Sequence, residues 1–165
     1  MHALMFSIIA LATPQPSPLP VTDVIAPHAQ LSLQVANSQA AREHGLMDRT
    51  VIPPHTGMLF VFDSDGPVDF WMKDTLVPLD MIFIGSDWRV RSVAADVSVV
   101  SPETPDSAIP LEHGMAKYVI ELRAGEAALD GIGPGVLLRQ LQPHGGSCLL
   151  PPGHLPSPSP TPNGA

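Results

Sequence analysis

Proline is concentrated at the two ends of the chain, and this distribution limits where a folded domain can lie. Of the 20 prolines among 165 residues, five lie in residues 1–27 and seven in residues 143–165. Each proline fixes φ and removes a backbone donor, so closely spaced prolines prevent both helix formation and sheet pairing. Charge has the opposite distribution, because every lysine and arginine lies between Arg42 and Arg139. We therefore expect one domain over residues 28–142, between an extended linker at 13–27 and a disordered Pro-rich tail at 143–165.

The first twelve residues include a nearly continuous apolar run that ends in Ala10-Leu11-Ala12. A small-x-small ending is typical of a signal-peptide cleavage site, and the run is shorter than the roughly 20 residues of a membrane-spanning helix. The basic region that normally begins a signal peptide is weak, so a terminal strand or a mis-assigned start codon also explains the run. We interpret residues 1–12 as a signal peptide and expect an exported protein, periplasmic or secreted. No cysteine lies near Ala12, so no lipid anchor is expected, and Cys148 is the single cysteine.

Short apolar segments separated by turn residues predict a mostly β domain. Leu31, Leu33 and Val35 recur at every second position, as in a half-buried strand. A short helix is expected over residues 39–44, capped by Asn37 or Ser38 and ended by Gly45. Further strands are expected over residues 58–62, 68–73, 79–84, 88–93, 118–123 and 136–141, with a turn at 63–67. Roughly seven short strands with one or two brief helices indicate a small α+β domain built on a barrel-like or sandwich arrangement of strands.

Four blocks of sequence within residues 30–140 stand in a recognisable order and spacing. They are Arg42–Arg49, Gly57–Phe62, Phe70–Asp80 and Tyr118–Gly125, the last followed by Gly131 and Gly135. In these blocks the chain resembles the DUF192 (UPF0127) family. The resemblance implies a small β-rich, barrel-like domain that is often exported and has no established activity. The family usually has asparagine where this chain has Asp74, which alters the site if that position supplies an amide donor.

The segments 68–73 and 79–84 are expected to pair as an antiparallel hairpin across residues 74–78. A register with Lys73 opposite Asp80 places one apolar face in the core and the polar residues on the other face. Two interpretations remain open: a cross-strand ion pair beside a covering Trp71, or a groove that binds a small molecule. The candidate ligand-binding residues are Asp69, Trp71, Lys73, Asp74 and Asp80.

The sequence gives little support for a metal site or for covalent catalysis. The aspartates at 63, 65, 69 and 74 have a calcium-loop spacing, but Pro67 and Val68 occupy a ligand position and the glycine position. The seven histidines show no zinc-binding spacing, and the single cysteine lies outside the expected domain. We therefore expect no metal, no cofactor and no nucleophilic residue.

Three functions remain open. The net charge of −8 argues against a nucleic-acid binder, which needs basic side chains to neutralise phosphates. The favoured function is a non-catalytic, monomeric, exported binding or accessory protein that holds a small molecule or envelope component beside Trp71 and Lys73, with no membrane span after cleavage. The alternative is an envelope-associated hydrolase with Asp80 or Glu121 as acid–base. A third is an interaction protein whose Pro-rich tail binds a partner.

Overall fold

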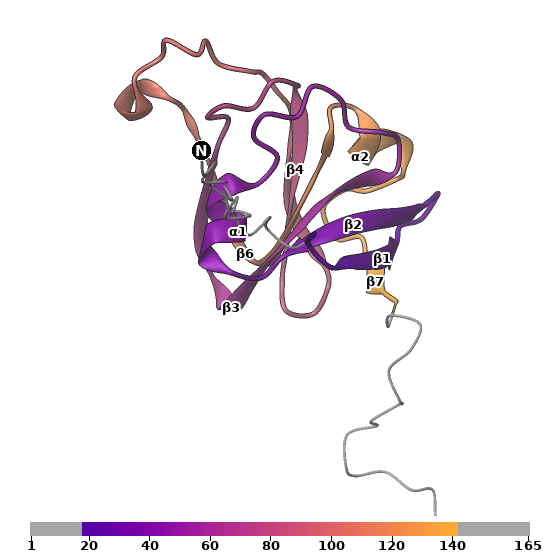
Figure 1. The fold of residues 1–165 in the computed structure, drawn as a ribbon. Helices are drawn as coiled ribbons and strands as arrows, with labels where there is room; N and C mark the ends of the chain where they lie inside the picture. The colour runs from indigo at the N-terminus through magenta and orange to yellow at the C-terminus, as the bar shows by residue number, and fades with distance from the viewer. Residues whose placement is uncertain (1–17, 142–165) are drawn as a thin grey trace, which may run out of the picture.

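The computed structural model describes residues 18–141, which form one seven-stranded sheet that curls into a half-barrel (Figure 1). The strand order is β5-β4-β6-β3-β2-β1-β7. The strands are β1 Val21–Ile25, β2 Gln30–Ala36, β3 Thr56–Trp71, β4 Leu79–Ile84, β5 Val90–Val97, β6 Leu111–Arg123 and β7 Arg139–Gln140. The helices are α1 Gln39–His44 and α2 Glu126–Leu129, with a single 3-10 turn, η1, at Asp106–Ala108. The predicted mostly β domain with one or two short helices is confirmed, with two helices among the described residues.

Two apolar clusters fill the space on the faces of the sheet. One includes Leu31, Leu33 and Ile120, and the other is built around Phe60, Phe70 and Phe83. Phe70 meets both of the other rings edge-on, at centroid distances of 4.9 and 6.0 Å. Aromatic rings packed edge to face add stability beyond the area that they bury.

The predicted strand at residues 31–35 and the helix at 39–44 are confirmed. Ser38 caps α1, because its Oγ accepts a hydrogen bond from the Ala41 amide at 3.2 Å. Gly45 ends the helix with a φ of 51°, a left-handed conformation that glycine adopts easily. Local residue chemistry therefore determines both ends of this helix.

The predicted linker at 13–27 is wrong for residues 21–25, which form β1 between β2 and β7. The flanking prolines suggested an extended, unpaired segment, but Pro20 precedes the strand and Pro27 follows it. Pro20 also contributes to the sheet, since its carbonyl accepts a hydrogen bond from the Val35 amide at 2.7 Å. Proline lacks only the donor, so it is compatible with strand ends. The predictions for residues 1–12 and 143–165 lie outside the described residues.

The predicted turn at 63–67 is also wrong, because β3 continues through it. The pairing of β3 with β6 shifts register between Val61 and Gly66, and residues Asp63, Ser64 and Asp65 are exposed there. Such a bulge bends a strand without ending it. The turn-forming residues therefore mark a bend in a long strand.

The predicted hairpin between residues 68–73 and 79–84 is wrong, because β6 lies between β3 and β4. Asp69 pairs with His113 of β6, and Asp80 pairs with Leu122 of β6. All six residues of β4 are buried. A strand buried on both faces is most stable in the middle of a sheet, and β4 is hydrogen-bonded to β5 and β6. Among the described residues, no helix is long and apolar enough to span a bilayer.

Candidate functional site

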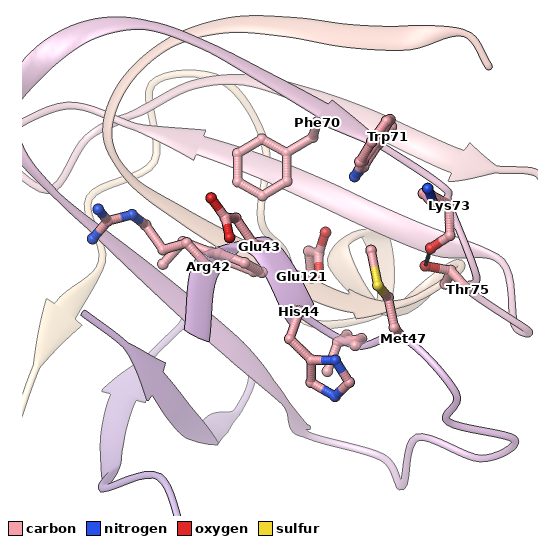
Figure 2. Close-up of a pocket in the computed structure, with 12 residues that line it drawn as sticks. Arg42, Glu43, His44, Met47, Phe70, Trp71, Lys73, Thr75 and Glu121 are labelled. Atoms are coloured by element: carbon pink, nitrogen blue, oxygen red, sulfur yellow. Dashed lines mark hydrogen bonds between the residues drawn. The ribbon is translucent and has the colours of Figure 1, made fainter. Parts of the chain in front are cut away.

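A pocket opens between α1 with its following turn and the end of β3 (Figure 2). Its narrow part has a volume of about 30 Å³, which suits one water molecule or one polar group of a ligand. A wider hollow of about 250 Å³ adjoins it. The two share Arg42, Glu43, Phe60, Phe70 and Trp71. The narrow part is also lined by His44, Gly45, Leu46, Met47, Lys73, Thr75 and Glu121.

Glu121 supplies the most unusual chemistry of this pocket. Glu121 is 4% exposed. It lies on β6, where its cross-strand neighbours are Met58 of β3 and Met81 of β4. No hydrogen bond joins the Glu121 carboxyl to another residue in the range 18–141. Burial raises the pKa of Glu121 to about 8, and the Arg49 guanidinium opposes this rise weakly. The carboxyl is therefore mostly protonated at neutral pH and can donate a hydrogen bond into the pocket.

Trp71 and Lys73 lie together at the side of the pocket (Figure 2). The Lys73 ammonium is 5.3 Å from the centroid of the Trp71 ring and 2.5 Å from Oδ2 of Asp106. The predicted pairing of Lys73 with Asp80 is thus wrong. The hydrogen bond to Asp106 raises the pKa of Lys73, so the ammonium is charged at neutral pH. Trp71 is 38% exposed and offers a ring face to a ligand.

Arg42 is held at the rim of the pocket by contacts with β3. Its Nη1 donates a hydrogen bond to the Val61 carbonyl at 3.0 Å, and its guanidinium lies 5.3 Å from the centroid of Phe62. A guanidinium has five N–H donors, so others remain for a ligand. The cap at Ser38 sets where α1 begins and so keeps Arg42 within this short helix.

Comparison with known proteins identifies the family of this chain. A family model described as "Uncharacterized ACR, COG1430" (DUF192) matches residues 22–140, most of the chain. The chain belongs to the DUF192 family. The resemblance seen in the sequence blocks is therefore confirmed, and UPF0127 is the same family.

Two solved structures resemble this DUF192 domain. One, from Sinorhizobium meliloti 1021, is described as a "putative transcription regulator"; it is 34% identical with a TM-score of 0.66, covering 76% of this chain and 98% of its own. The other, from Novosphingobium aromaticivorans DSM 12444, is a protein of unknown function; it is 27% identical with a TM-score of 0.63, covering 83% of this chain and 99% of its own. No curated protein is a significant match.

The DUF192 fold brings together only some of the residues singled out in the sequence. Trp71 and Lys73 line the pocket, and Asp69 lines its wider part, where it lies 2.7 Å from Nδ1 of His113. Asp80 lines none of the pocket, and its two carboxylate oxygens accept hydrogen bonds from the Asp96 and Ala127 amides at 2.8 and 2.9 Å. It therefore holds neighbouring elements together.

Asp74 lines a separate hollow beside Lys73. Its φ is 50°, and its carbonyl accepts a hydrogen bond from the Asp48 amide at 2.9 Å. Asparagine and aspartate are the non-glycine residues that adopt this left-handed conformation most readily. The backbone conformation therefore explains why both residues suit this position in the DUF192 family.

Sequence reasoning assigned no ligand-binding role in this pocket to Arg42, His44, Met47 or Thr75, although all four lie in blocks that carry the family resemblance. Nothing in the sequence shows that α1 covers the end of β3. Glu121 was identified only as a possible acid–base. Its signal is its place in the apolar run Val119–Leu122, where an acidic residue interrupts a central strand.

Proposed function

We propose that this DUF192 domain binds a small, oxygen-rich organic molecule in the pocket between α1 and β3. The observation that carries the proposal is the buried Glu121 carboxyl, which faces the pocket without a hydrogen-bonding partner among the described residues. No fully buried side-chain polar atom among the described residues lacks a partner, so the Glu121 oxygens reach the space of the pocket, where a ligand can complete their hydrogen bonding in place of water.

The donors around the pocket define the class of ligand. Protonated Glu121, the Arg42 guanidinium and the Lys73 ammonium all donate hydrogen bonds, so a matching ligand presents oxygen acceptors. The acidic groups nearby are already engaged: Glu43 by the Gln39 amide at 2.8 Å, and Asp69 by His113. The aromatic rings of the wider hollow suit the apolar face of a compact ligand such as a sugar or a hydroxy acid. The net charge of −8 argues against nucleic acid as the ligand.

The test is a ligand screen of the full chain read by Trp71 fluorescence and by thermal shift, with sugars, hydroxy acids and amines as probes. We expect a sugar or hydroxy acid to bind and to change the emission, and Trp71→Phe to remove the change. Trp88 stacks on Tyr118 at a centroid distance of 4.4 Å and serves as the internal reference. Glu121→Gln keeps a neutral donor and should retain binding, whereas Glu121→Leu should weaken it about tenfold, the value of one hydrogen bond.

Two results would contradict this proposal. One is the failure of every sugar and hydroxy acid to bind with a Glu121-dependent affinity. The other is binding of an amine that is lost in Glu121→Gln, since this would require the ionised carboxylate and hence a cationic ligand.

A second candidate function is hydrolysis with Glu121 as the general acid. A carboxyl with a pKa of about 8 retains its proton at neutral pH, as a general acid must. Turnover of a bound ligand distinguishes the two functions, because Glu121→Gln then abolishes turnover while binding persists. Binding without turnover supports the non-catalytic function.

We also propose that the protein is exported to the periplasm or beyond the cell. The nearly continuous apolar run of residues 3–11 and the Ala10-Leu11-Ala12 ending support this proposal. Mass spectrometry of the protein recovered from its native host is expected to show Thr13 at or near the N-terminus. An intact Met1 on protein from the cytosolic fraction would reject it.

A further inference from the structure

His55, Glu126 and Asp130 form a cluster outside the proposed pocket. One ligand atom of each lies within 4.8 Å of the others. Glu126 and Asp130 are four residues apart along α2 and its C-cap, so they face the same side, and His55 approaches from the turn before β3. The Nδ1 of His55 is 3.3 Å from Oε1 of Glu126 and 3.2 Å from Oδ1 of Asp130.

The two carboxylates of this cluster are buried, whereas the histidine is open to solvent. The side chains of Glu126 and Asp130 are 1% and 3% exposed, and that of His55 is 52% exposed. Within residues 18–141, the Asp130 carboxylate has no hydrogen-bonding partner except His55. A single imidazole nitrogen is thus the partner of both Asp130 oxygens, and it also lies near Oε1 of Glu126, so a cation at this point would face both acids.

The charges of the cluster do not balance with a neutral imidazole. Glu126 and Asp130 contribute two negative charges, and the neighbouring Arg123, whose Nε donates a hydrogen bond to Oε2 of Glu126, supplies one positive charge. With His55 neutral, the two carboxylates and Arg123 carry a net charge of −1, which favours a cation, and a bound divalent cation would bring this net charge to +1. It would replace the single imidazole contact of the Asp130 carboxylate with a metal–oxygen bond.

We propose that His55, Glu126 and Asp130 form a binding site for a divalent transition metal such as Zn²⁺. Bonds of about 2.0–2.2 Å separate adjacent ligand atoms by roughly 3.0–3.4 Å in octahedral or tetrahedral geometry. The separations of His55 from both acids lie in this range. One nitrogen and two carboxylate oxygens form a ligand set that zinc and similar metals accept, with the remaining positions open to water on the exposed side of His55.

Hydrogen bonds from neighbouring groups already orient the Glu126 carboxylate. The backbone N–H of His55 donates to Oε1 of Glu126 at 2.9 Å, while Arg123 donates to the other oxygen. Outer contacts of this kind fix ligating carboxylates in metal sites. The sequence did not predict the site, because His55 lies 71 and 75 residues from its two partners and no histidine pair marks it.

The test is a calorimetric titration of Zn²⁺ into the full chain after chelator treatment and removal of the chelator. We expect one saturable site and a higher melting temperature with zinc. His55→Gly suits the φ of 57° at this position and removes the imidazole. Its zinc affinity should fall more than about 100-fold, since loss of outer contacts alone weakens metal sites about 10–100-fold. Asp130→Asn should also weaken binding at least tenfold.

The matched control is His113→Ala. The Nδ1 of His113 lies 2.7 Å from Oδ1 of Asp69. Both of these side chains are exposed, and the pair has one carboxylate, whereas the proposed metal site has two buried carboxylates. Removal of His113 should leave the zinc affinity unchanged. If His55→Gly does not fold, the affinity of Asp130→Asn decides. The proposal is overturned if the wild-type chain shows no saturable site, or if its affinity is the same in Asp130→Asn and any folded His55 variant.

Discussion

Replacement of Glu121 with glutamine is expected to raise the stability of the domain strongly at pH 8 and little at pH 5. The pKa of this carboxyl is 4.5 in the unfolded chain and about 8 in the folded one. Below pH 4.5 it is protonated in both states and has no effect on the pH dependence. Between these pKa values the unfolded chain ionises and the folded chain does not, so stability falls as the pH rises, and above pH 8 the loss stays constant.

The size of this effect follows from the shift, since one pKa unit corresponds to about 1.4 kcal/mol. Between pH 5 and pH 8 the wild-type chain should lose about 3 kcal/mol more of its unfolding free energy than Glu121→Gln. Urea unfolding of both proteins at the two pH values measures the difference. Glu103→Gln changes an exposed carboxyl outside the pocket and should behave like wild type. Parallel pH profiles for Glu121→Gln and wild type would show that the Glu121 carboxyl is hydrated in the folded state.

Replacement of Asp80 with alanine is expected to lower the unfolding free energy by about 3 kcal/mol, because backbone amides of Asp96 and Ala127 lose their acceptor. The Asp80 side chain is fully buried and joins β4 both to β5 and to α2. Asp80→Asn keeps one carbonyl oxygen and should lose less. Urea unfolding at pH 7 measures both variants.

The control is Asp87→Ala. Asp87 also accepts a backbone hydrogen bond, from the Arg89 amide at 3.2 Å, but it lies in an exposed turn. Solvent can replace that acceptor, so the change should be about 0.5 kcal/mol or less. Equal effects of the two substitutions would mean that burial of Asp80 is unimportant, and normal stability of Asp80→Ala would reopen a functional role for this residue.

Segments with a local signal could be predicted from the sequence. Ser38 and Gly45 bracket α1 by side-chain capping and by a positive φ, which depend only on neighbouring residues. The alternation of Leu31, Leu33 and Val35 likewise identified β2, since period-two burial is a property of the strand itself. Such signals fail where a neighbouring strand decides the outcome, as at residues 63–67, where pairing with β6 carries β3 through turn-forming residues.

The candidate site was only partly predictable for the same reason. Trp71 and Lys73 were identified because they are close in sequence and of suggestive chemistry. Asp106, which accepts a hydrogen bond from Lys73, and Arg42, which lines the same pocket, are distant in the chain, and only the packed fold places them there.

The sequence by itself determined the family, the mostly β class, the capped helix and the identity of the side chains that could carry chemistry, because these depend on local pattern and residue type. The tertiary structure alone decided the strand order, the insertion of β6 between β3 and β4, and the burial of Asp80 and Glu121. The physical reason is that strand pairing and desolvation depend on contacts between residues far apart in the chain. Many registers satisfy the local pattern, and the packing of the whole core selects one of them.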